Sequence, residues 1–262
     1  PGATLTVNGP GLNLGTVEGS GTIKLVDNSN FPAGDYDNFF PDTTCIGGGG
    51  VEYNMSAGSE TVLSNILNVR RVILSGDGEK VMAIGQKTNV CENVEIRDNG
   101  IFRLDDNVEL RIKGDFIKES SAFFDGDYAN TSIILDGSSL QTIDGNFTGT
   151  QSFQNIETNN ANHISILDAN NEDVEIAESL VMELGRINTN ANNSLRLLNG
   201  ASITGNFADN TFVNGPFQRQ LQASASNFLF PVGNDGVYLP IEVDEPAYSG
   251  GGPLKVWTAE FY

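Results

Sequence analysis

Short stretches of alternating apolar and polar residues recur along the chain. They are three to five residues long, and alternation at this period predicts a β-strand with one buried face. The segment 177–184 would fit a helix if taken alone, but its neighbours favour a strand. The clearest strand signals lie at 5–7, 22–25, 94–96, 101–104, 108–112, 132–135, 164–167 and 194–198.

Turn-forming residues separate these stretches. Asp, Asn and Gly tolerate the positive φ that tight turns require. Together with Gly, Asn, Thr, Ser and β-branched residues elsewhere, they predict an all-β protein with many turns. Examples of the turns are Asp98-Asn99-Gly100, Asp136-Gly137 and Asn199-Gly200.

An internal repeat is visible as the pattern F-x-x-G-D-Y-x-N, which occurs at 31–38 and again at 123–130. Weaker matches pair 93–96 with 173–176 and 113–116 with 204–207. A surplus in the first copy fits 39–50, which holds Cys45 and four consecutive glycines. These matches predict two repeats, 31–122 and 123–211, each about 80 to 90 residues long.

A repeat of this length suits about four coils of roughly 20 residues. We therefore expect residues 1–211 to form a right-handed parallel β-helix, or β-solenoid, with apolar side chains stacked inside. Asn at equivalent turns can form side-chain ladders. A string of β-sandwiches is the alternative geometry. Short, closely spaced strands favour the solenoid.

The amino-acid composition changes near Thr211, where aromatic residues and Pro become more frequent and the internal repeat stops. Residues 212–262 are expected to form a C-terminal β cap that covers the last coil, or the first strands of a following β-sandwich. The chain opens at Pro1 without a signal peptide and ends in strand-like sequence. Both ends indicate a fragment of a longer protein.

Charge excludes several classes of partner. The chain has 14 Lys+Arg and 34 Asp+Glu, a net charge of −20. Nucleic acid and anionic membrane surfaces both require clustered basic residues. No apolar run approaches the roughly 18 residues of a membrane span. We therefore expect no nucleic-acid partner and no insertion into a membrane.

Several motifs resemble the large surface proteins that Bacteroidota export through the type IX secretion system. The resemblance implies a secreted or outer-membrane-associated protein at the cell surface, of the adhesin or gliding-motility type. Its partners would be other surface or secretion-system proteins, polysaccharides or solid surfaces. The motifs are V-E-Y-N at 51–54, V-I-L-S-G at 72–76, F-Q-N-I-E at 153–157, F-V-N-G at 212–215, F-P-V-G at 230–233 and Y-L-P-I at 238–241.

Paired carboxylates are the candidates for catalysis, since such pairs on a β-helix can cleave polysaccharides. They are Asp105 with Asp106, and Asp125 with Asp127. We identify no cluster that adds the Lys, Arg, Tyr or His needed to complete an acid–base site, and turns of a solenoid need Asp in any case. The only histidine, His163, lies in a polar, turn-like run, which argues against a catalytic triad. We therefore predict no catalytic residues and no enzymatic activity.

Calcium is the cofactor to consider, because Gly-Asp-Tyr-x-Asn occurs at 34–38 and 126–130 with oxygen ligands in Asp35, Asp37, Asp125 and Asp127. These residues lack the regular spacing of known calcium loops. A recurring turn with a packed Tyr is the simpler interpretation. The sequence therefore predicts no bound metal or other cofactor.

The sequence permits two covalent modifications, a disulfide bond and O-glycosylation. Cys45 and Cys91 permit one disulfide, which would stabilise the fold by about 4 kcal/mol in the chain-entropy model. Two unpaired thiols are the alternative. Asp42-Thr43-Thr44 resembles the O-glycosylation sequon of Bacteroidota, with Thr43 as the acceptor.

Taken together, these features predict a non-enzymatic structural or adhesive segment of a large bacterial surface protein. The alternative is a β-helix that binds or cleaves carbohydrate.

Overall fold

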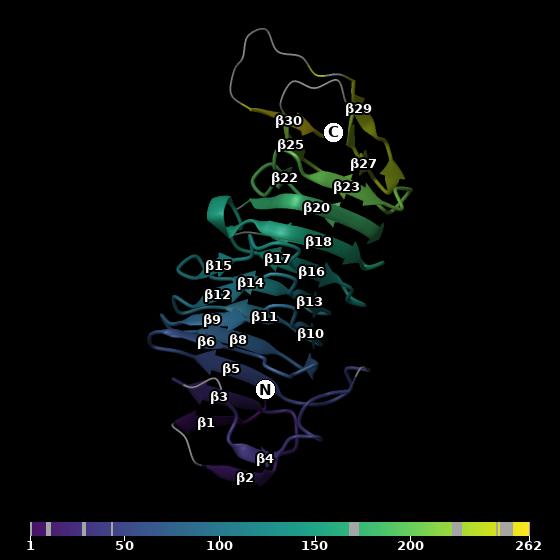
Figure 1. The fold of residues 1–262 in the computed structure, drawn as a ribbon. Coiled ribbons are helices and arrows are strands. Elements are labelled where there is room, and N and C mark those ends of the chain that lie inside the picture. Colours follow the sequence, from purple (N-terminus) through teal and green to yellow (C-terminus); the bar gives the residue numbers. More distant parts are fainter. Residues whose placement is uncertain are drawn as a thin grey trace. The chain divides into compact units, whose positions relative to one another are not determined.

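The computed structural model describes residues 2–8, 12–27, 30–42, 44–167, 173–221, 227–244, 246 and 254–261. Figure 1 shows the strands of the fold. Two compact units divide the chain, Pro1–Thr131 and Ser132–Tyr262. Both are β-solenoids of stacked parallel coils, so the expected fold class is confirmed. In the described residues the only helical segment is a 3₁₀ turn, Gly149–Gln151.

The coils of the first unit have three sides, because successive strands enter three parallel sheets in turn. The first sheet contains β1 (Thr4–Asn8), β3 (Thr22–Val26), β5 (Gly50–Asn54), β8 (Val72–Ser75), β11 (Val94–Ile96) and β14 (Phe116–Lys118). The second contains β6 (Ser59–Thr61), β9 (Glu79–Met82), β12 (Ile101–Leu104) and β15 (Phe123–Asp125). The third contains β7 (Asn68–Val69), β10 (Lys87–Val90) and β13 (Glu109–Ile112).

Register gives the length of a coil. Val51, Val72, Val94 and Phe116 lie side by side on four successive strands, so these coils are 21 or 22 residues apart. All four side chains are fully buried. This spacing agrees with the coils of roughly 20 residues that the sequence predicts, and the stacked apolar column forms the core.

Asparagine ladders accompany the coils, as the sequence predicts. The amide of Asn89 donates to the side-chain oxygen of Asn68 at 2.8 Å, and Asn130 donates to Asn107 at 3.1 Å. The predicted turn residues also adopt left-handed conformations, with φ of 52° at Asp98 and 61° at Asn99. Local turn chemistry was therefore readable from the sequence.

The two tyrosines of the F-x-x-G-D-Y-x-N pattern lie in different settings, so their expected equivalence is wrong. Tyr36 follows β4 (Ala33–Asp35), which pairs only with β2 (Asn13–Thr16), and its hydroxyl donates to the carbonyl oxygen of Pro32 at 2.8 Å. Tyr128 instead follows β15 and lies under the Arg103 guanidinium. The segment around Tyr36 is an insertion between β3 and β5, where no coil imposes the pattern. The repeat boundaries 31–122 and 123–211 stay a prediction.

The second unit also stacks parallel strands on two main faces. One contains β16 (Ser132–Leu135), β18 (Phe153–Asn159), β20 (Val174–Leu184), β22 (Leu195–Leu197) and β25 (Phe217–Leu221), with β23 (Ser202–Gly205) also paired to β20. The other contains β17 (Gln141–Asp144), β19 (Ile164–Leu167), β21 (Ile187–Asn188), β24 (Val213–Asn214) and β27 (Val232–Asn234). The segment 177–184 is part of strand β20, as expected.

Among the pairs of strands in the described residues, antiparallel pairing appears only toward the C-terminal end. β27 pairs with β28 (Val237–Tyr238), β26 (Phe228–Phe230) with β29 (Ile241–Val243), and β25 with β30 (Lys255–Ala259). Parallel stacking continues through β24, β25 and β27, beyond the change of amino-acid composition at Thr211. Whether this region caps the solenoid or begins a sandwich stays a prediction.

Candidate functional site

An arginine joins carboxylates from neighbouring coils on the β6–β9–β12–β15 sheet. The Arg103 guanidinium donates through Nη1 to Glu79 at 2.8 Å and through Nε to Asp105 at 3.0 Å. Its Cζ lies 5.8 Å from the centre of the Tyr128 ring. We call Glu79, Arg103, Asp105, Asp125 and Tyr128 the Arg103 cluster.

Strand register brings these residues together. Arg103 on β12 lies beside Asp125 on β15, because the two strands pair in parallel one coil apart. Phe102 and Phe124, the inward neighbours of these two residues, are fully buried, so alternation turns the charged residues outward. Arg103 and Asp125 are 22 residues apart, which is one coil, but the sequence predicts the coil length only as roughly 20 residues.

The surroundings of the Arg103 cluster raise the pKa values of Asp125 and Tyr128. Burial raises the pKa of the Asp125 carboxyl, and nearby Glu79 and Asp127 add to the rise while Arg103 opposes it. Burial also raises the pKa of the Tyr128 hydroxyl, with the charge of Asp125 acting in the same direction. Asp125 and Tyr128 therefore both hold their protons more readily than an ordinary aspartate and tyrosine.

The Arg103 cluster is poorly suited to acid–base catalysis. A carboxyl with a raised pKa beside ionised carboxylates is a pattern that general-acid catalysis uses. However, Arg103 already binds Glu79 and Asp105, and Tyr128 resists losing its proton. The cluster also has more carboxylates than cations, which repels an acidic sugar. It fits hydroxyl groups better than carboxylates.

The structure places the four candidate aspartates, Asp105, Asp106, Asp125 and Asp127, in different surroundings. Asp105 and Asp125 belong to the Arg103 cluster. The prediction that no Arg or Tyr lies near them is therefore wrong. Strand pairing and the adjacent turns bring these partners close. Asp106 accepts the backbone N–H of Ala129 at 3.0 Å and so stabilises the next coil's turn. Asp127 is exposed.

The two segments considered for calcium do not form a common site. Asp35 accepts the backbone N–H of Asp37 at 3.1 Å, which closes a local turn. Asp125 is the last residue of β15, and Asp127 lies two residues after it. Within the described part of the chain, no group of three or more His, Cys, Asp or Glu residues is arranged to hold a metal ion.

His163 is half-buried and packs against Arg186. Its Nδ1 accepts the backbone N–H of Arg186 at 3.1 Å, and its Nε2 lies 2.9 Å from the Arg186 guanidinium. Burial lowers the pKa of His163, and the charge of Arg186 adds to this effect. The residue is therefore integrated into the second unit more closely than the sequence suggested.

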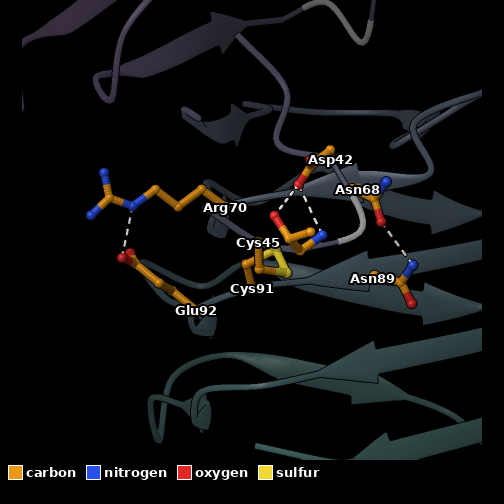
Figure 2. The surroundings of a disulfide bond; sticks show 8 residues. Asp42, Cys45, Asn68, Arg70, Asn89, Cys91 and Glu92 are labelled. Carbon is orange, nitrogen blue, oxygen red and sulfur yellow. Dashed lines mark hydrogen bonds and ion pairs between the residues drawn. A yellow bond between two sulfur atoms is a disulfide. The ribbon is translucent and has the colours of Figure 1, made fainter. Parts of the chain in front are cut away.

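Cys45 and Cys91 form a disulfide in the structure, with Cα atoms 5.4 Å apart (Figure 2). The bond ties the segment between β4 and β5 to the turn between β10 and β11. Arg70 and Glu92, which form an ion pair at 2.7 Å, lie beside it. Thr43, the candidate glycosylation site, lies outside the described residues.

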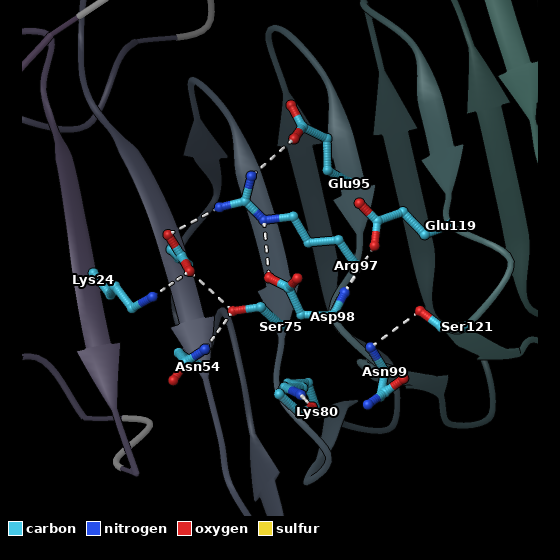
Figure 3. A network of polar contacts seen from close by, with 12 residues as sticks. Lys24, Asn54, Ser75, Lys80, Glu95, Arg97, Asp98, Asn99, Glu119 and Ser121 are labelled. Atoms are coloured by element: carbon cyan, nitrogen blue, oxygen red, sulfur yellow. Dashed lines mark hydrogen bonds and ion pairs between the residues drawn. The ribbon is translucent and has the colours of Figure 1, made fainter.

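A second polar network crosses the first sheet (Figure 3). Glu52 accepts from Lys24 at 2.7 Å and from the Ser75 hydroxyl at 2.9 Å, and Arg97 reaches it from two coils away at 3.3 Å. Burial alone would raise the pKa of Glu52, but these hydrogen bonds and the charges of Lys24 and Arg97 lower it overall. Glu52 is thus held ionised as the centre of a link across four strands.

The chain matches no family model, no curated protein and no solved structure. Among the described residues, no helix is long and apolar enough to span a membrane.

Proposed function

We propose that this chain is a non-enzymatic structural segment of a large extracellular surface protein, associated with the bacterial outer membrane. It acts as a stiff spacer or presenting surface in adhesion or gliding. The resemblance to proteins exported by the type IX system supports this role. The disulfide supports an oxidising, extracellular compartment.

The observation that carries the proposal is that basic side chains form ion pairs with carboxylates on other coils. Ion pairs connect residues on different coils in both units. Each exposed pair stabilises by only about 0.2–1 kcal/mol. All act along the stacking direction, in addition to the strand hydrogen bonds. The pairs are Lys24–Glu52, Arg97–Glu52, Arg70–Glu92, Lys87–Glu109, Arg103–Glu79 and Arg196–Glu175.

Single-molecule stretching tests this mechanical role. We expect the chain, pulled from its two ends, to lengthen in steps of one coil or a few. A coil of about 22 residues releases roughly 75 Å when extended. The span of 46 residues between Cys45 and Cys91 should stay closed until the disulfide is reduced. Smooth extension at low force, without steps, would contradict the proposal.

A cellular test separates a spacer from an inert segment. Deleting the segment from the parent protein should impair attachment of the cell to surfaces or its gliding. Replacing the segment with a flexible Gly/Ser linker of equal residue number should not restore the phenotype, because such a linker lacks stiffness. Full restoration by the linker would show that stiffness is irrelevant.

Polysaccharide cleavage is the second candidate function, and the raised pKa of Asp125 beside Asp105 and Arg103 is the observation that favours it. We expect no release of reducing ends or unsaturated sugars from neutral or acidic polysaccharides. If products did appear, and Asp105→Asn with Asp125→Asn abolished them while Asp127→Asn did not, the enzymatic function would replace the structural one.

A further inference from the structure

A polar pocket of about 390 Å³ lies at one corner of the first coils of the first unit. Its volume is within the range of small-molecule sites. Six residues that line it carry the argument: Ser20, Thr22, Gly50, Arg70, Arg71 and Glu92. We call it the Arg71 pocket.

Strand register explains why this corner is hollow. Thr22 and Gly50 pair across β3 and β5, and Arg71 lies at the next position of the same column. Because Gly50 has no side chain, the Arg71 guanidinium extends over it to the Thr22 hydroxyl at 3.2 Å. A Cβ at Gly50 would lie 3.3 Å from the Arg71 Cβ and 3.5 Å from the Thr22 hydroxyl oxygen. The glycine therefore creates the space.

Arg71 differs from the other arginines of this unit. Arg70, Arg97, Arg103 and Arg111 each lie within 4.0 Å of a carboxylate. Among the described residues, Arg71 has no such partner, and the Thr22 hydroxyl is the side-chain group it donates to. In a chain of net charge −20, an unpaired guanidinium beside a cavity points to an anionic ligand.

The remaining lining specifies what else the ligand carries. The carbonyl oxygen of Ser20, the Thr22 hydroxyl and the Glu92 carboxylate are acceptors for hydroxyl groups. The lining contains no aromatic or large aliphatic side chain that would hold an apolar group. From this chemistry we propose that the Arg71 pocket binds an acidic sugar, with its carboxylate on Arg71 and its hydroxyls on the other groups.

The pocket is held in shape before any ligand arrives. The backbone N–H of Arg70 donates to Gly49 at 3.1 Å, and that of Glu92 donates to Arg70 at 2.6 Å. The disulfide fixes Cys91, the neighbour of Glu92, and Cys45, which lies five residues before Gly50 (Figure 2). A preformed site loses little free energy to ordering on binding. The inference does not depend on the spacer role, since a spacer without a ligand would still be stiff.

Calorimetric titration of the whole chain with trigalacturonate tests the proposal, with the neutral galactose trimer as the matched sugar. We expect binding of the acidic trimer that weakens with added salt, and at least tenfold weaker binding of the neutral one. Arg71→Gln should weaken binding about tenfold or more, which corresponds to about 1.4 kcal/mol. Arg71→Lys should lose less, because it keeps the charge but not the bidentate geometry.

The control is Arg111→Gln, which removes an arginine of the same unit outside the pocket and should leave binding unchanged. Circular dichroism would confirm that all variants fold. No binding of trigalacturonate would overturn the proposal, as would equal loss in Arg71→Gln and Arg111→Gln. A short glutamate peptide that binds as tightly as the sugar would also overturn it, because the site would then recognise any carboxylate.

Discussion

Lys80 is a cation inside the solenoid. Its side chain is fully buried, and its Nζ donates to the carbonyl oxygens of Gly76 and Gly78. It lies in register with Phe102, so an apolar ring is its neighbour on the next coil. Burial lowers the pKa of Lys80 to about 8, although the charge of Asp77 opposes this shift.

The pH dependence of stability follows from this lowered pKa. Between about pH 8 and 10.5 the unfolded chain keeps the Lys80 proton while the folded chain has lost it, so the free energy of unfolding rises with pH. Lys80→Met removes this gain. We expect the stability of wild type relative to Lys80→Met to increase by up to about 3 kcal/mol across this range.

Urea unfolding at several pH values measures this difference. Phe102→Leu is the matched control, since it changes the neighbouring core position without a titrating group and should differ from wild type by a constant amount. A constant difference for Lys80→Met as well would show that Lys80 does not titrate in this range.

Single residues were only partly predictable. Turn residues such as Asn99 follow from local backbone preferences. The buried position of Lys80 does not, because its segment, E-K-V-M, shows no feature that distinguishes an inward lysine from an outward one. Its partners are carbonyl oxygens of the turn just before β9, and backbone carbonyls of this kind leave no signal in the sequence.

At the scale of elements, the insertion between β3 and β5 depends on the Cys45–Cys91 disulfide. The insertion has its own aromatic cluster, in which Phe39 and Phe40 lie with ring centres 5.3 Å apart. It does not continue the coil pattern. The disulfide therefore adds a covalent cross-link between the insertion and the solenoid body.

We expect thiol titration of the unfolded, non-reduced protein to find no free thiol. Cys45→Ser with Cys91→Ser should lower the free energy of unfolding by up to about 4 kcal/mol, because the bond closes a 46-residue span. Denaturant unfolding of oxidised wild type and the double variant measures the loss. Two free thiols, or equal stability of both proteins, would contradict the prediction.

The Arg103 cluster shows what the sequence leaves hidden at this scale. Strands and coil length were both predictable from alternation and turns. Which side chains meet depends on the exact register, and an error of one residue turns a strand's outward side chains inward. The approximate coil length alone therefore could not pair Arg103 with Asp125.

At the scale of the whole molecule, each of the two compact units contains fully buried aromatic side chains. Phe102 is fully buried in the first unit, and Phe147 is fully buried in the second with its ring centre 4.6 Å from that of Phe153. In stacked folds each coil contacts mainly its neighbours, so destabilisation spreads over a limited distance.

Hydrogen exchange should reveal this locality. Phe102→Ala should cost about 3–5 kcal/mol and lower amide protection mainly within Pro1–Thr131. Phe147→Ala should act mainly within Ser132–Tyr262. Mass spectrometry of exchanged peptides measures both variants against wild type. Equal loss of protection throughout the chain in either variant would show one cooperative unit instead.

The reversed strand β30 has a consequence for how far the stack can grow. Parallel strands in register form a template that accepts further strands, as amyloid fibrils do. β30 runs against β25 along Phe217–Leu221, and so occupies that edge with the opposite polarity. An incoming coil that follows the parallel pattern finds no matching ladder on β25. The antiparallel pairing therefore leaves no free parallel edge on β25 along Phe217–Leu221 for another chain to extend.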